Sequence, residues 1–156
     1  MNKKEEVINA ARDLFTKYGY KKVSMDEIAK EANVTKKTIY SYFSDKEAMF
    51  KYFASEELQS MKEEIENDVN SNASFIDRVS KILYKSLLFR KNSDLIKTII
   101  KEISKSNTAE CISFLKFYDD EIVSYIEEKI EQEIQNKTIK KCDAHLTAFI
   151  IYKVYS

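Results

Sequence analysis

The segment at residues 33–43, NVTKKTIYSYF, combines lysine, tyrosine, threonine and serine with few wholly apolar residues. In a helix that starts at Thr35, a rotation of about 100° per residue turns Ile39 and Phe43 into the fold. The opposite side then presents ammonium, hydroxyl and aromatic groups, which suit phosphates and base edges. Its members are Lys36, Lys37, Tyr40 and Ser41, with Thr38 and Tyr42 at the edge.

The residues before this segment predict two helices that would support it. Apolar residues recur at helical spacing over residues 7–18, and Gly19 follows, where a left-handed C-cap is expected. Ser24 and Glu27 then stand three residues apart, as in a capping box, and predict the start of a second helix.

The spacing between the second and third helices is typical of a helix-turn-helix. Ala29 is small enough for close helix crossing, and Asn33 suits a left-handed turn. Thr35 is placed to cap a third helix that runs through Phe43. Ile39, ten residues after Ala29, would fill the angle between the helices, so the third helix could enter a major groove. The alternative is a plain three-helix bundle with a solvated polar face.

The rest of the chain predicts a helical body. With one Gly and no Pro in 156 residues, the composition favours an all-α fold. Ser44 and Glu47 suggest a capping box for a long fourth helix, and further helices are expected at about 74–90, 94–105, 108–136 and 143–156. We expect a DNA-binding head at residues 1–46 and a ligand-binding and dimerisation body at residues 47–156.

The charge distribution separates a mildly basic N-terminal part from a mildly acidic remainder. Residues 1–53 hold eleven Lys and Arg against eight Asp and Glu, whereas the remainder holds fifteen against eighteen. The longest apolar run is too short to span a bilayer, and the N-terminus has no signal-peptide pattern. Two distant cysteines, Cys111 and Cys142, indicate reduced thiols in a cytoplasmic protein. The lone His145 and the absence of a catalytic motif predict no metal site, no cofactor and no enzymatic activity.

The pieces AARDLFTKYGY, SMDEIAKEANV, TIYSYF and SDKEAMF occur in order within residues 7–50. This stretch resembles the N-terminal DNA-binding domain of TetR-family transcriptional regulators. The resemblance implies that Tyr40 packs on base edges or sugar, and that Tyr42, Lys46 and Ser24 contact phosphates. Asn33 and Lys37 stand where the family often has Gly, which leaves the contact pattern at Lys37 open. The predicted DNA-contacting residues are Ser24, Thr35, Lys36, Lys37, Thr38, Tyr40, Ser41, Tyr42 and Lys46.

The resemblance also implies a homodimeric repressor that leaves a double-stranded DNA operator when a small-molecule effector binds the body. The body is rich in aromatic residues, which would either pack the core or line an effector cavity. The alternative function is an effector-independent architectural or protein-interaction module that binds DNA. The residues predicted to line the cavity are Tyr84, Phe114, Phe117 and Tyr118.

The last segment, CDAHLTAFIIYKVYS, is expected to form the dimer interface. Leu146, Phe149, Ile150 and Val154 make an apolar stripe at helical spacing. The alternative is that this stripe packs on the subunit's own core. No helix-ending residue precedes Ser156, so we expect the interface to continue beyond the end of this sequence.

Overall fold

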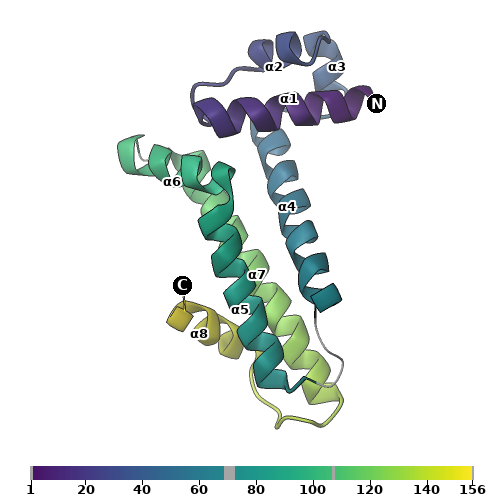
Figure 1. Cartoon of the computed structure of the whole chain (residues 1–156), viewed down its shortest axis with the longest axis vertical. Helices are drawn as coiled ribbons and strands as arrows, with labels where there is room; N and C mark the ends of the chain where they lie inside the picture. Colours follow the sequence, from purple (N-terminus) through teal and green to yellow (C-terminus); the bar gives the residue numbers. More distant parts are fainter. Residues whose placement is uncertain (1, 69–72, 107, 156) are drawn as a thin grey trace. The chain divides into compact units, whose positions relative to one another are not determined.

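The structure is a computed structural model that describes residues 2–68, 73–106 and 108–155. The described residues form helices joined by turns, with no strand among them (Figure 1), which confirms the all-α prediction. None of these helices combines the length and the apolar character that crossing a membrane requires. The helices are α1 (Lys3–Tyr18), α2 (Met25–Glu31), α3 (Lys36–Tyr40), α4 (Lys46–Asp68), α5 (Phe75–Asn92), α6 (Asp94–Ser106), α7 (Ala109–Gln135) and α8 (Ala144–Tyr155).

The chain divides into two compact units. Unit 1 contains Met1–Glu57 and Lys91–Leu115, and unit 2 contains Leu58–Arg90 and Lys116–Ser156. All three boundaries between the units fall inside helices, because α4, α5 and α7 each contribute residues to both units. The division into a head at residues 1–46 and a body at residues 47–156 is a functional one, and it stays a prediction.

An aromatic cluster forms the core of unit 1. The Phe15 ring meets the Phe50 ring edge to face at 5.3 Å between centroids, and Phe50 lies 4.6 Å from Phe114. Tyr20 and Phe53 complete the cluster. Burial of a large side chain contributes about 1.5–3 kcal/mol, so these contacts hold α1, the first part of α4 and the start of α7 together.

Within unit 1, α6 is fastened to the C-terminal end of α1 by hydrogen bonds. The Thr98 hydroxyl donates to the Thr16 carbonyl at 2.9 Å, and the Lys21 backbone N–H donates to Glu102 Oε1 at 2.8 Å. Gly19 lies beside this carboxylate with φ 87° and ψ 163°. Its φ is positive as predicted, but its ψ is extended and not that of a left-handed helical cap. A Cβ at residue 19 would lie 2.5 Å from Glu102 Oε2, so the Glu102 carboxylate would have to shift from its place beside Gly19.

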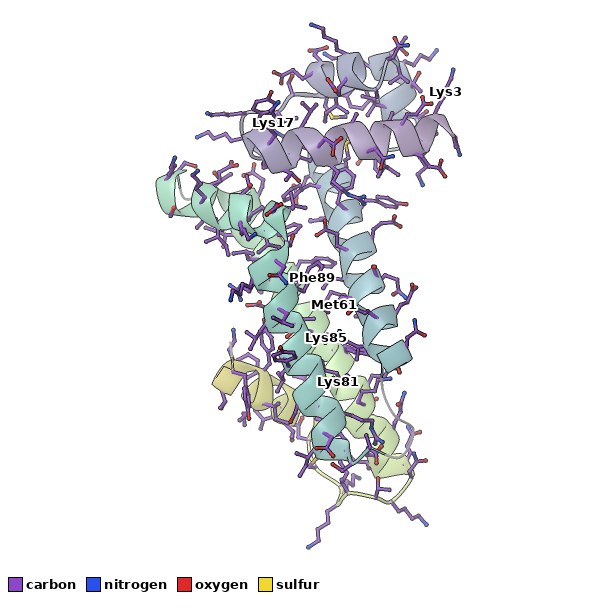
Figure 2. All side chains as sticks on the ribbon, in the orientation of Figure 1. Lys3, Lys17, Met61, Lys81, Lys85 and Phe89 are labelled. Atoms are coloured by element: carbon purple, nitrogen blue, oxygen red, sulfur yellow. The ribbon has the colours of Figure 1, made fainter. Side chains whose placement is uncertain are left out.

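Unit 2 is built on α7. The Tyr118 hydroxyl donates to the Ser86 carbonyl of α5 at 3.0 Å, and its ring stacks on Phe89, which Figure 2 labels. Nearer the other end of the two helices, Arg78 pairs with Glu133, so α5 and α7 run antiparallel. The end of α4 also contacts α7, because the Tyr125 hydroxyl of α7 donates to the Glu66 carboxylate of α4.

Helix α8 packs against α7 within unit 2. The Tyr152 hydroxyl donates to Asp119 Oδ1 at 2.6 Å, and His145 Nδ1 lies 2.8 Å from Glu127 Oε2. Tyr152 and Ala148 are buried in this contact. Leu146 and Val154 stay exposed.

Two predicted helix boundaries were wrong. The cap of α4 is Asp45 and not Ser44, because Asp45 Oδ1 accepts the Ala48 N–H at 2.7 Å and Ser44 itself donates to Asp45. A carboxylate one residue later is the stronger acceptor for a helix start. Helix α3 ends at Tyr40, although Phe43 is still buried as predicted.

Candidate DNA-contacting surface

The turn after α2 places α3 at a fixed angle. Asn33 has φ 50°, in the left-handed region. The Val34 N–H donates to the Ala29 carbonyl at 2.9 Å and the Asn33 N–H donates to the Lys30 carbonyl at 3.2 Å. These two bonds form a Schellman motif, which satisfies the last carbonyls of α2. The predicted left-handed turn at Asn33 is therefore confirmed.

Side chains between α2 and α3 bury the inner face of the pair. Ile28 and Ile39 are fully buried, and Ala29 is 7% exposed, which allows the close approach that the spacing predicted. These residues fix the rotation of α3 about its axis. The residues on its opposite face therefore point to solvent.

Side-chain caps hold the starts of both helices. Ser24 Oγ accepts the Glu27 N–H at 3.3 Å while Glu27 Oε2 accepts the Ser24 N–H at 2.8 Å, so the capping box is confirmed. The backbone N–H and the hydroxyl of Ser24 both donate to the Glu27 carboxylate and lower the pKa of Glu27. Thr35 Oγ1 accepts the Thr38 N–H at 3.3 Å and caps α3. Each of these hydroxyl groups already caps its helix, so a DNA phosphate bound by Ser24 or Thr35 would be a second hydrogen-bond partner.

The outer face of α3 is exposed and basic. Tyr40 is 51% exposed and Tyr42 is 38% exposed. Lys37 is exposed and makes no ion pair with the described residues. Lys36 is already paired with Asp26 at 2.7 Å. Ser41 uses its hydroxyl within the helix end, where it donates to the Thr38 carbonyl at 2.7 Å.

Lys46 is held more tightly than a solvent-facing phosphate contact would be. Its ammonium donates to the Tyr20 carbonyl at 2.9 Å and to the Val23 carbonyl at 3.0 Å, and lies 4.2 Å from the centroid of the Tyr20 ring. Burial lowers its pKa. One N–H remains for a phosphate, so the predicted contact stays a prediction. Its structural role is to hold the loop that leads into α2.

The four residues predicted to line an effector cavity differ in burial and are divided between the two units. Phe114 belongs to unit 1, where it packs on Phe50, and the other three belong to unit 2. Tyr118 is buried with its hydroxyl paired, whereas Tyr84 is 61% exposed and Phe117 is partly exposed. These positions leave the predicted cavity untested.

Two functional contacts escaped sequence reasoning. Asp26 of α2 pairs with Lys36 on the exposed face of α3, and the sequence pattern predicted no contact for Asp26. Glu102, which holds the loop after α1, lies 81 residues from its partner Lys21. The first contact could have been sought from the helix-turn-helix geometry, since α2 and α3 must cross. The second leaves no local signal in the sequence.

Helix α3 follows a tight turn after α2 and carries cations and aromatic rings on its exposed outer face. This arrangement is typical of a helix-turn-helix DNA-binding protein. Residues 7–53 match the family model described as "Bacterial regulatory proteins, tetR family". The relative "Uncharacterized HTH-type transcriptional regulator YhgD" of Bacillus subtilis (strain 168) is 36% identical over 155 residues, which are 99% of this chain and 81% of that protein. The chain belongs to the TetR family and is a DNA-binding transcriptional regulator.

Two further relatives concern fatty acid metabolism by name or ligand. The "Fatty acid metabolism regulator protein" of Bacillus subtilis (strain 168) is 30% identical over 104 residues, or 65% of this chain and 53% of that protein. The crystal structure of the transcriptional regulator FadR from Bacillus subtilis in complex with stearoyl-CoA has the same fold. Its TM-score is 0.66 at 21% identity, and the match covers 97% of this chain and 82% of that one.

Proposed function

We propose that the protein is a homodimeric repressor that reads its operator through the outer face of α3. The observation that carries this proposal is the exposure of Lys37 and Tyr40 on a helix whose inner face is locked by Ile39. Lys37 offers an ammonium donor to a base edge or phosphate, and Tyr40 offers a ring and a hydroxyl to a base or sugar.

The remaining predicted contacts would position the helix on the DNA backbone. Lys36, Tyr42 and the third N–H of Lys46 would face phosphates, together with hydroxyl groups at the starts and ends of α2 and α3. Lys36 must exchange its ion pair with Asp26 for a phosphate, which an exposed pair allows at small cost. The hydroxyl members of this set are Ser24, Thr35, Thr38 and Ser41.

A second copy of the chain is the proposed partner of α8. Leu146, Phe149, Ile150 and Val154 are exposed on this helix, although Ala148 and Tyr152 pack on α7. An exposed apolar stripe of this kind is typical of a protein–protein contact. A dimer would also set two α3 helices about 34 Å apart, the spacing of successive major grooves.

The proposed effector is a long-chain fatty acid or its coenzyme A thioester. The support is the fatty acid metabolism relative and the stearoyl-CoA bound to FadR. We place the effector in unit 2, where Tyr84 and Phe117 retain exposed aromatic surface. Tyr118 would act as a packing residue of unit 2, and Phe114 would act as a packing residue of unit 1.

Fluorescence anisotropy of the protein on an operator obtained by in vitro selection would test the repressor mechanism. We expect stearoyl-CoA to release the labelled DNA and coenzyme A without an acyl chain to leave it bound. The Tyr84→Ala variant should need more stearoyl-CoA, whereas Ile76→Ala, which shortens another exposed side chain of α5 outside the proposed dimer surface, should respond as the parent does. A complex that survives saturating acyl-CoA of every chain length would reject the effector and favour the effector-independent module.

A further inference from the structure

A groove within unit 1 is lined by lysine residues from two elements. Its volume is about 440 Å³, and it lies where the end of α1 and the following loop meet α6. Figure 2 labels Lys17, one of its lining residues, near the end of α1. The charged residues that line it are Lys17, Lys21, Lys22, Lys101, Lys105 and Glu102.

The positive charges of this groove are not balanced by the protein. None of its five lysines forms an ion pair with a carboxylate among the described residues. Glu102, the acidic lining residue, already accepts the Lys21 N–H and lies against Gly19. By contrast, Lys51, Lys97 and Lys129 elsewhere in the chain each have a carboxylate partner. Like charges around a concave surface repel one another, and a bound anion relieves that repulsion.

The shape of the groove favours a small ligand over DNA. Figure 1 shows α6 on one side of α1 and the α2–α3 pair on the other, so DNA bound by α3 lies on the far side of α1 from α6. A concave site of this volume is in the usual size range for small molecules. Lysine ammonium groups are established binders of phosphate, to which each offers three donors. Tyr18 adds a half-exposed ring at the rim.

We propose that this lysine groove binds a small molecule that carries two or more phosphate groups, through Lys17, Lys101 and Lys105. Lys21 and Lys22 hold the same ligand from the loop, so the ligand bridges α6 and the segment that leads into α2. The site is separate from the proposed acyl-CoA effector site in unit 2.

Isothermal titration calorimetry with inorganic pyrophosphate at constant ionic strength tests the lysine groove without DNA. We expect saturable binding that weakens by about tenfold or more in the Lys101→Gln/Lys105→Gln variant, because two charge-assisted contacts are lost. The Lys140→Gln/Lys141→Gln variant removes the same charge from exposed positions in unit 2 and should bind as the parent does. Because neither pair is buried, both variants should fold.

Four results would overturn the proposal. The first is the absence of saturable pyrophosphate binding at millimolar concentration, and the second is equal weakening in both variants. The third is loss of operator affinity in Lys101→Gln/Lys105→Gln without any pyrophosphate binding by the parent, which would assign these lysines to the DNA backbone. Citrate bound as tightly as pyrophosphate would also reject the phosphate assignment.

Discussion

Asn33 and Lys137 occupy the same left-handed position in two separate helix ends. Lys137 has φ 60° after α7, with its N–H bonded to the Ile134 carbonyl and the Thr138 N–H bonded to the Glu133 carbonyl. This is the Schellman motif that Asn33 makes after α2. Asparagine tolerates the conformation, whereas lysine carries a Cβ penalty there.

Replacement of Lys137 by glycine should therefore stabilise the protein. We expect Lys137→Gly to raise the free energy of unfolding by about 0.5–1 kcal/mol, since relief of the strained φ exceeds the entropy lost by glycine. Urea denaturation measures the change. Lys140→Gly, three residues later in the same loop, should lower stability slightly, and an equal response of the two variants would contradict the strain argument.

The contact between His145 and Glu127 makes the docking of α8 sensitive to pH. The Glu127 carboxylate raises the pKa of His145 above its ordinary value of about 6.5, with smaller contributions from Asp143 and Asp120. A raised pKa in the folded state means that the charged histidine stabilises the fold. This contribution is fully present below the ordinary pKa and is lost as the pH rises through the raised value.

An NMR titration of the single histidine would measure this pKa. The parent value should lie above 6.5, and Glu127→Gln should bring it back toward that value. Glu131→Gln, one turn further along α7, is the matched control and should leave the titration unchanged. A His145 pKa at or below the ordinary value in the parent would refute the contact.

The ion pair between Asp26 and Lys36 should restrain DNA binding. The Asp26 carboxylate raises the pKa of Lys36 and would lie near DNA phosphates in the complex. We expect Asp26→Asn to increase affinity several-fold for all DNA sequences, because Lys36 then binds a phosphate without first giving up an ion pair and a negative charge beside the DNA is removed. Asp13→Asn makes the same charge change on α1. If Asp26→Asn raised DNA affinity no more than Asp13→Asn does, the ion pair between Asp26 and Lys36 would not restrain DNA binding.

At the scale of elements, local patterns predicted the helix-turn-helix well because its bonds are local. The caps at Ser24 and Thr35 and the turn at Asn33 depend on partners within five residues. Lys46 and Glu102 could not be assigned in the same way. Lys46 binds carbonyls 26 and 23 residues away, and Glu102 binds an N–H 81 residues away. Such contacts with the backbone leave no trace in residue type or spacing.

The junction of α1 and α6 should depend jointly on Gly19 and Glu102. We expect Gly19→Ala to destabilise the protein by about 1–3 kcal/mol, because its backbone conformation is nearly exclusive to glycine. Part of the loss is the contact of the new Cβ with Glu102 Oε2, so Glu102→Ala should cost less in the Gly19→Ala background than alone. Thermal unfolding of the four proteins of this cycle gives the coupling, and strictly additive losses would contradict it.

At the scale of the whole molecule, composition predicted the all-α class because one glycine and no proline leave few ways to build a strand-rich fold. It did not predict the two compact units. The boundaries near Glu57, Arg90 and Leu115 lie within helices, where no loop signal or change in composition marks them. Aromatic content alone also could not identify the residues that bind an effector, since aromatic residues pack cores as readily as they line cavities.

The most direct test of the account is operator binding by the Lys37→Ala/Tyr40→Ala variant, measured by anisotropy over a series of salt concentrations. We expect affinity for the selected operator to fall by about 1–3 kcal/mol or more, and discrimination against unrelated DNA to narrow. The control, Lys17→Ala/Tyr18→Ala, removes the same residue types from the C-terminal end of α1 and should bind the operator normally. Parental affinity and specificity in Lys37→Ala/Tyr40→Ala would contradict the claim that the outer face of α3 reads DNA.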